Sequence, residues 1–481
     1  MLRQRVVVGI RTLMPSFIHR QPALGAGAGK KKSSTAALDG LRGIAALFVF
    51  CFHVLFSYTT AIEYGYGQSE ANQHIVQLPF LSLFYRGHSM VAVFFVVGGY
   101  VMSIKPLSLM HSHQAAAAPG VLVSSVFRRG IRLYLPAIAA TFVTMCTVYF
   151  GLWEYPRQFV TGDEQLIVYS DLHPLPKATL ASQFWDWLNE VASMTDLFYY
   201  YNKNGFLLPY YNKYDPHLWT VPFEYRSSLI VTVVLLALSR CKFAVRLFLT
   251  GLIVLFCGFW DRWEVVCFLA GMILCDIDLF NQKPEPRPAR LETIVEEDED
   301  LLPQWEAKTR LALEDSATRN GYVKHWLLLF LAGLYLLSTP NLDIGNTPGY
   351  QTLFQLTPST YSDKKRFLQS LGAICTVWAI TNCSALQSPF VTSFAQYLGS
   401  ISYSLYIVHG PLIHIVGYSI TPNIWIHFTG KEGLNWIAGL ILGSGILAAF
   451  VVITADIFWR HVDLKSIAIA RYLECACFAD T

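Results

Sequence analysis

Residues 38–60 read LDGLRGIAALFVFCFHVLFSYTT, and this stretch decides the class of fold. A helix of about 20 apolar residues is long enough to cross a lipid bilayer. Charged or imidazole side chains occur in the stretch only at Asp39, Arg42 and His53. The sequence therefore predicts a membrane-spanning helix over residues 38–60.

The same apolar pattern recurs along the whole chain. Of the 481 residues, 53% are hydrophobic and only 14% are charged, against about 25% charged in an ordinary soluble domain. This composition predicts an all-α, polytopic membrane protein and excludes the disordered, fibrous and disulfide-scaffold classes. About ten transmembrane helices are predicted, near residues 38–60, 81–104, 130–152, 217–239, 243–260, 263–280, 325–340, 367–386, 397–420 and 434–458.

Lysine and arginine residues in the short connections predict the orientation. Basic residues precede residue 38 and follow the second, fourth and tenth predicted helices. Cytosolic loops of membrane proteins carry an excess of Lys and Arg, and these basic residues all lie on the cytosolic side of the membrane if both termini are cytosolic. The basic residues 364–366 fall on the other side and break this rule. The predicted organisation is a basic cytosolic tail at 1–37, a transmembrane domain at 38–460 and a cytosolic tail at 461–481.

The compartment and two connecting segments have more than one interpretation. The endoplasmic reticulum or another endomembrane is the expected location, and the Arg-rich, acid-free start also fits a mitochondrial presequence. Residues 153–216 form a loop rich in Tyr and Trp, which either lies at the membrane interface or covers a substrate cavity. Residues 281–324 form a Pro-rich, acidic cytosolic insert, and we interpret its run of acidic residues as a solvent-exposed segment without a chemical role.

Ionisable side chains at membrane depth are costly and usually face a protein interior or a cavity. In the first predicted helix, Arg42 and His53 are eleven residues apart, so they share a helix face about 16 Å apart along the axis. Gly40 and Gly43 allow another helix to approach closely. The plainer interpretation is that Arg42 reaches lipid headgroups and His53 is a packed core residue. The polar residues singled out in this way are Asp39, Arg42, His53, His88, Arg132, Glu224, His409, His414 and Asp456.

A second basic pair begins the third predicted helix. Arg129 and Arg132 are three residues apart and share a helix face. In the predicted orientation they lie level with Arg42 at the cytosolic surface. Three guanidinium groups at one depth suit a phosphate or pyrophosphate group, which arginine binds with two hydrogen bonds. The alternative is simple anchoring to the membrane surface.

Two further predicted helices carry polar side chains that reach the same interior. Glu224 lies near the start of the fourth, just inside the non-cytosolic face, and Tyr406 and His409 lie three residues apart in the ninth. Counted from the cytosolic ends, His53 and His409 lie at similar depth. Glu224, counted from the other side, is expected near that layer.

In this order, five segments resemble the acyltransferase 3 family of integral membrane O-acyltransferases. They are residues 38–53, 94–100, 128–132, 219–224 and 401–409, and the resemblance covers about residues 36–458. It implies transfer of an acyl group, commonly acetyl, from acyl-coenzyme A to a hydroxyl of a sugar, lipid or small metabolite. Arg42 and His53 match the family's essential Arg and His, and Arg129 and Arg132 match its Arg-x-x-Arg pair.

The chain departs from the family pattern at two places. Gly98 stands where the family usually has Ser. The fourth-helix motif reads Trp219-Thr220-Val221-Pro222 with one acid, Glu224, whereas the family usually has Trp-Ser-Leu with paired acids. The second departure puts the catalytic role of Glu224 in doubt.

The resemblance and the residue chemistry together predict a mechanism. Histidine has a free pKa of about 6.5, so His53 suits the role of general base, or of a nucleophile that forms an acyl-imidazole. Glu224 or Tyr406 is expected to orient the ring or to stabilise charge. Arg42, Arg129 and Arg132 are expected to bind the phosphates of acyl-coenzyme A. His409 is expected either to support the acceptor or to act in packing.

Other interpretations of the sequence remain open. Intramembrane charges and ten helices also fit a transporter of a small solute, although paired inverted repeats are not evident. The other large class of membrane O-acyltransferases and an inactive scaffold are further alternatives. The 13 histidines show no ligand spacing with cysteines or acids, so no metal site and no bound cofactor are predicted. The acceptor, whether sterol, terpenoid, polyketide, sugar or lipid, is not specified, and the composition predicts no nucleic-acid partner.

Overall fold

The computed structural model describes residues 35–162, 166–197, 212–281 and 323–478. Within these ranges the regular secondary structure is helical and no strand occurs, as the all-α prediction required. The basic tail at 1–34, the aromatic stretch at 198–211 and nearly all of the acidic insert, at 282–322, lie outside the described residues. Those parts of the sequence predictions are therefore not addressed by the structure.

The helices of the first half contain most of the predicted site. Their bounds are α2 (Ala36–Tyr58), α3 (Gly87–His111), α4 (Ala118–Tyr149), α5 (Glu154–Thr161), α6 (Leu180–Thr195), α7 (Thr220–Ala237), α8 (Phe243–Phe259) and α9 (Trp263–Asn281). Short 3-10 turns connect them: η1 (Ala61–Glu63), η2 (Ile75–Gln77), η3 (Leu81–Tyr85), η4 (Ala115–Ala117) and η6 (Pro216–Trp219).

The second half begins with a helix at Val323–Leu337. It continues with η7 (Ile344–Asn346), α11 (Gln351–Leu356), α12 (Lys364–Asn382), α13 (Ser384–Gln387), η8 (Ser388–Val391), α14 (Ser393–Leu412), α15 (Tyr418–Ile424), α16 (Gly433–Phe458) and α17 (Leu464–Cys477). Three π-helical turns, Ile413–Gly417, Trp425–Thr429 and Trp459–Asp463, make the path from α14 to α17 almost continuously helical.

By helix length and hydropathy the chain is a multi-pass membrane protein. Five described helical segments are long and apolar enough to cross a membrane: Ala36–Tyr58, Gly87–His111, Ala115–Tyr149, Pro216–Ala237 and Gly433–Cys477. Phe243–Phe259 and Val323–Leu337 are shorter apolar helices. The predicted number of ten spans therefore stays a prediction.

Two helices start away from the expected positions. Residues 81–85 form the 3-10 helix η3, so α3 begins only at Gly87, where a Cβ would lie 2.8 Å from that of Phe52. The helix α4 begins at Ala118 rather than near residue 130, because Pro119 occupies a first-turn position that tolerates proline. Arg129 and Arg132 consequently lie well inside a long helix.

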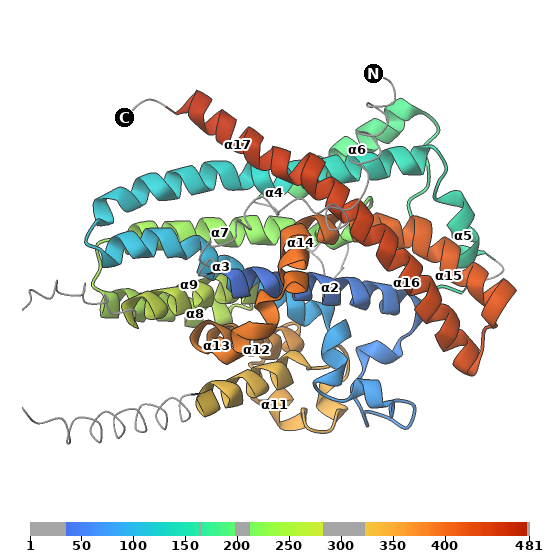
Figure 1. Cartoon of the computed structure of the whole chain (residues 1–481), viewed down its shortest axis with the longest axis horizontal. Helices are drawn as coiled ribbons and strands as arrows, with labels where there is room; N and C mark the ends of the chain where they lie inside the picture. The colour runs from blue at the N-terminus through green and yellow to red at the C-terminus, as the bar shows by residue number, and fades with distance from the viewer. Residues whose placement is uncertain (1–34, 163–165, 198–211, 282–322, 479–481) are drawn as a thin grey trace, which may run out of the picture.

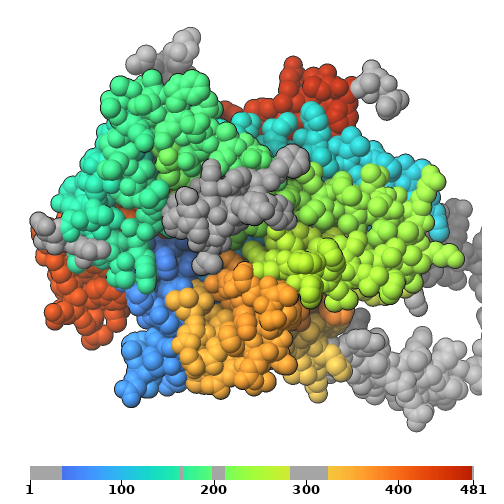
Figure 2. All heavy atoms as spheres, turned by 180° about the vertical axis from the view of Figure 1, so that it is seen from behind, coloured from blue at the N-terminus to red at the C-terminus, as the bar shows by residue number. Residues whose placement is uncertain are grey.

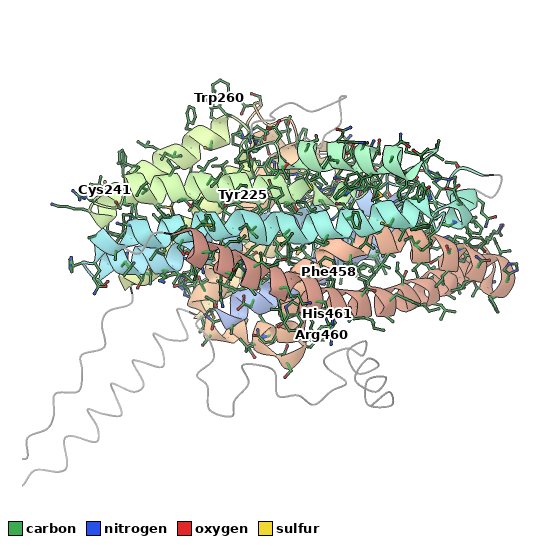
Figure 3. All side chains as sticks on the ribbon, turned by 90° about the horizontal axis from the view of Figure 1, so that it is seen from above. Tyr225, Cys241, Trp260, Phe458, Arg460 and His461 are labelled. Atoms are coloured by element: carbon green, nitrogen blue, oxygen red, sulfur yellow. The ribbon has the colours of Figure 1, made fainter. Side chains whose placement is uncertain are left out.

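Long helices run side by side along the longest dimension of the molecule, among them α4 and α7 (Figure 1). One buried apolar core gathers around α3 and α9, and a second lies among α2, α4, α14 and α16. Seen from above, Phe458, Arg460 and His461 lie together where α16 passes into α17, and Cys241 lies beyond the end of α7 (Figure 3). Figure 2 shows the opposite face, where the segment that contains α5 and α6 lies beside the segment of α7 to α9.

The expectation that Gly40 and Gly43 allow close helix approach is confirmed: Gly43 lies against α14, and Gly40 lies against Phe390 of η8. A Cβ at Gly43 would lie 2.3 Å from the backbone nitrogen of Gly399. A Cβ at Gly399 would in turn lie 2.5 Å from the carbonyl oxygen of Asp39. The two helices therefore meet backbone to backbone, which brings the histidines of α2 and α14 together deeper in the structure.

The basic group that broke the orientation rule has internal partners. Arg366 is buried, lies 4.6 Å from the ring centroid of Trp263, and donates from Nη2 to Nδ1 of His88 over 3.1 Å. Lys365 is also buried and its Nζ lies 2.8 Å from Asp363. Because these cations are paired inside the protein, they do not report on which side of the membrane their loop lies.

Candidate active site

The three predicted arginines line one pocket of about 430 Å³. Arg42 comes from α2, and Arg129 and Arg132 come from α4. Side chains of α3, α7, α14 and the turn before α17 complete the wall, including Gly98, Glu224, Ser402, Tyr403 and Asp463. The three arginines thus share one cavity, and their common depth in the membrane stays a prediction.

Glu224 lies in this arginine pocket as well. Its Oε1 accepts a hydrogen bond from Nη2 of Arg129 over 3.0 Å. The buried Nε of Arg129 has no hydrogen-bond partner among the described residues. The carboxylate therefore engages Nη2 of this guanidinium and leaves its hydrogen-bonding capacity incompletely satisfied within the described residues.

Tyr406 and Thr220 also line the pocket and connect it to a second polar cluster. The Tyr406 hydroxyl donates to the backbone carbonyl of His217. Since a hydroxyl has one proton, Tyr406 accepts from the Thr220 hydroxyl, whose oxygen lies 2.6 Å away. This pair ties α14 to the start of α7 between the arginines and the histidines.

The second cluster consists of three imidazoles: His53 from α2, His217 from η6 and His409 from α14. The ring centroids are 4.0 Å apart for His53 and His217, 4.7 Å for His217 and His409, and 5.2 Å for His53 and His409. His217 and His409 are buried, and His53 is partly exposed. The expectation that His53 and His409 lie at similar depth is confirmed by their ring contact.

The hydrogen bond of His409 fixes its tautomer. Nδ1 lies 2.7 Å from the carbonyl oxygen of Tyr406, which can only accept, so Nδ1 carries the proton. In the neutral ring, Nε2 then keeps a lone pair. This Nε2 is buried and has no hydrogen-bond partner within the described part of the chain.

Two carboxylates hold His217 from opposite sides. Its Nδ1 lies 2.9 Å from Asp215 and its Nε2 lies 3.1 Å from Asp171. Burial raises the pKa of Asp215, although its hydrogen bonds with His217 oppose the rise. Burial also acts to raise the pKa of Asp171, but the charge of His217 and its hydrogen bond lower that pKa overall. Asp171 is therefore the more readily ionised carboxylate of the two.

Gly410 makes this close arrangement possible. A Cβ at this position would lie 2.5 Å from Nδ1 of His217 and 2.6 Å from Oδ1 of Asp215. Any larger residue beside His409 would push η6 away from α14. The contact between the two histidines thus depends on a residue without a side chain.

The other polar residues that the sequence singled out lie elsewhere. His414 shares a 2.9 Å hydrogen bond between its Nδ1 and that of His173, and it stacks on Trp153. Asp456 is buried and bound by Arg460 over 2.7 Å. The backbone carbonyl of Asp39 lies beside Gly399 at the crossing of α2 and α14.

Sequence reasoning missed His217, Asp215 and Asp171. Asp215 comes two residues before His217, the first residue of the fourth predicted helix, and caps the turn by accepting from the His217 backbone N–H over 3.2 Å. That capping pattern was a usable signal. Asp171 had no such signal in the sequence, because it comes from the loop before α6 and reaches His217 only through tertiary contact.

The departure at Gly98 also has a structural counterpart. Gly98 lines the arginine pocket, and a Cβ there would lie 3.1 Å from the ring of Phe268. Phe268 is fully buried against Phe95. The aromatic ring thus crowds the space that a serine side chain would enter.

Comparisons with known proteins point to one family. Residues 35–456 match the family model described as an acyltransferase domain. The O-acetyltransferase PaAT-1 of Phomopsis amygdali is 29% identical over 472 residues, covering 92% of this chain and 85% of that protein. The acyltransferase clz18 of Cochliobolus lunatus and the acyltransferase R4 of a Phoma species are each 25% identical, covering 90% of this chain and 94% of their own length. No solved structure matches.

Proposed function

The chain belongs to the acyltransferase 3 family, and from that membership we propose that it moves an acetyl group from acetyl-coenzyme A to a hydroxyl of a small molecule. One observation carries the proposal. A pocket lined by three arginines ends at Tyr406, which is hydrogen-bonded to the backbone of a residue in a three-histidine cluster. The arginine pocket and the histidine cluster are thus neighbours joined through Tyr406, although none of the three histidines lines the pocket.

Arg42, Arg129 and Arg132 would bind the phosphates of the donor. Arginine is suited to phosphate because its planar fork donates two parallel hydrogen bonds. Glu224 is paired with Arg129 in the same pocket, so we place Glu224 as a residue that positions this guanidinium. This replaces the alternative that Glu224 orients the ring of His53.

His53 would act as the general base. It removes the proton of the acceptor hydroxyl while the oxygen attacks the thioester carbonyl, and the departing thiolate then takes that proton to give free coenzyme A. The alternative, an acyl-imidazole on His53, uses the same residue in two steps. His409 would act in packing beside His53, whose ring centroid lies 5.2 Å away, because its unprotonated Nε2 cannot share the single hydroxyl proton with the base. Tyr406 would hold α14 to the start of α7 through Thr220.

The acceptor is expected to be a hydroxylated metabolite with apolar parts, because the histidine cluster lies among apolar helices. The similarity to an O-acetyltransferase of Phomopsis amygdali supports a role in secondary metabolism. We place the protein in the endoplasmic reticulum or another endomembrane with both termini cytosolic. In this orientation acetyl-coenzyme A would enter the arginine pocket from the cytosol.

The decisive experiment uses purified protein and labelled acetyl-coenzyme A with a panel of hydroxylated sterols, terpenoids, polyketides, sugars and lipids. A product whose mass exceeds that of one acceptor by one acetyl group is expected. Transport is the second candidate function because of the buried charges. Uptake of a solute by reconstituted protein, with no binding of coenzyme A, would replace the proposal by that function.

A further inference from the structure

The three-histidine cluster has a geometry that acid–base chemistry alone does not require. The ligand-capable atoms of His53, His217 and His409 all lie within 4.8 Å of one another. Nitrogen ligands of a tetrahedral zinc ion lie about 3.4 Å apart, given Zn–N bonds of about 2.1 Å. Shifts of about 1 Å in the rings would therefore bring three imidazole nitrogens around one ion.

The surroundings of two of these rings resemble the outer shell of a metal site. A metal-binding histidine usually donates its other N–H to a carboxylate or a backbone carbonyl. His217 directs Nδ1 to Asp215, and His409 directs Nδ1 to the carbonyl of Tyr406. In both rings Nε2 is thus the nitrogen turned away from that partner. Nε2 of His409 is buried without a hydrogen-bond partner in the described residues, and Nε2 of His217 faces Asp171.

A fourth ligand and the required negative charge are also close. Oδ2 of Asp171 lies 3.1 Å from Nε2 of His217. A carboxylate oxygen at that distance could share the ion with the imidazole. Together, Asp171 and Asp215 could supply two negative charges beside three neutral rings, which would balance a divalent cation in a site that is otherwise costly to charge.

We propose that His53, His217, His409 and Asp171 bind one divalent transition-metal ion, for which zinc is the best match, with Asp215 positioning His217. The imidazole-rich donor set favours zinc over magnesium or calcium, which prefer oxygen ligands. The regulatory consequence rests on the proposed function. Bound zinc occupies the lone pair of His53, so it stops acyl transfer, and the metal-free chain is the active form.

The binding test uses the full chain in detergent after metal removal with a chelator. Zinc is titrated in competition with a chromophoric chelator, and metal content is measured after gel filtration. One zinc per chain is expected. Asp215→Asn should lower zinc affinity about 10- to 100-fold, because it removes only an outer partner. His409→Ala, which removes a ligand, should lower it further.

His88→Ala is the matched control. His88 packs on the ring of Phe52 at 5.0 Å, as His53 does, but it bonds Arg366 outside the cluster. This variant should keep the zinc affinity of the unaltered chain. Asp171→Asn serves as a second ligand variant if His409→Ala elutes as aggregate. Failure of the unaltered chain to bind stoichiometric zinc, or equal affinity in the ligand variants and the control, overturns the proposal.

Activity assays separate this inference from the proposed function. The metal-free chain should acetylate its acceptor, and one equivalent of zinc should abolish the reaction. Stoichiometric zinc binding without inhibition would overturn the regulatory role. If zinc binds with the expected variant dependence while the metal-free chain transfers no acetyl group to any acceptor, the metal site stands and the proposed function fails.

Discussion

At the scale of single residues, proton placement on the imidazoles controls what the histidine cluster can do. His409 has its proton on Nδ1 because the Tyr406 carbonyl can only accept. His217 has a carboxylate at each ring nitrogen. His53 is partly exposed, whereas His217 and His409 are buried, so His53 is the member of the cluster that an incoming hydroxyl can reach.

Replacement of His53 tests the base. His53→Ala should lower the turnover of acetyl transfer by about two to four orders of magnitude, because general base catalysis contributes that much. Turnover is measured with labelled acetyl-coenzyme A, and gel filtration checks that the protein is folded. His88→Ala should keep most of the activity. Normal turnover in a well-folded His53→Ala protein would remove this residue from the mechanism.

Replacement of Arg132 tests the phosphate site. A hydrogen bond to a charged group contributes about 1.5–3 kcal/mol, so Arg132→Ala should raise the Kd for acetyl-coenzyme A about 10- to 150-fold. The acceptor KM should change much less. Donor binding is measured by isothermal titration calorimetry.

Arg128 provides the control for this variant. It lies on the same helix but pairs with Glu474 of α17 at 3.1 Å and does not line the pocket. Arg128→Ala should leave donor affinity within about twofold, since it removes a surface ion pair only. Equal losses in the two variants would favour a general effect of positive charge over a defined phosphate site.

At the scale of secondary-structure elements, the crossing of α2 and α14 positions the histidine cluster. The two helices touch through Gly40, Gly43 and Gly399, where a Cβ on one would meet backbone atoms of the other or of η8. Gly410 performs the same task between α14 and η6. Small residues thus allow three elements to approach until their imidazoles make contact.

A methyl group at this crossing should destabilise the protein. Gly43→Ala places a Cβ 2.3 Å from Gly399 N and 2.6 Å from Leu398 C, so the backbones must separate. Overpacking of this kind costs about 1–3 kcal/mol. The thermal unfolding midpoint, followed by tryptophan fluorescence in detergent, should fall.

Gly251→Ala is the matched control in α8, where a Cβ would have no neighbour within 4 Å. Because alanine has a higher helix propensity than glycine by about 1 kcal/mol, the midpoint should stay equal or rise. A midpoint that falls as far in Gly251→Ala as in Gly43→Ala would contradict the assignment of the effect to the helix crossing.

At the scale of the whole molecule, the arrangement of helices defines two ends. The connections between α3 and α4 and between α7 and α8 lie at one end, and those after α2 and α4 lie at the other (Figure 1). The arginine pocket contains Arg42, which lies near the N-terminal end of α2. If that end is cytosolic, as we propose, the donor enters from the cytosol.

Cysteine labelling tests this orientation. In a chain without its native cysteines, Arg240→Cys in the connection after α7 and Glu70→Cys in the connection after α2 replace exposed side chains. In sealed microsomes, a membrane-impermeant maleimide should label Arg240→Cys directly and Glu70→Cys only after the membrane is opened. Labelling of both variants from outside would contradict the proposed topology.

Some features of the site were predictable from the sequence because they are local. The helix over 36–58 follows from an apolar run, and helix geometry alone puts Arg42 and His53 on one face. Arg129 and Arg132 share a face for the same reason. These predictions needed only the spacing along one element, and the shared pocket is consistent with them.

Other features depended on which distant segments meet. Glu224 was expected near the histidine layer, and the structure pairs it with Arg129, because α4 and α7 pack side by side. His217 gains Asp171 from a loop, His53 from α2 and His409 from α14. The chain alone determined that helices with a few polar side chains would enter the membrane. Which of those side chains touch was decided by packing, since burial leaves each polar group to find its partner on another element.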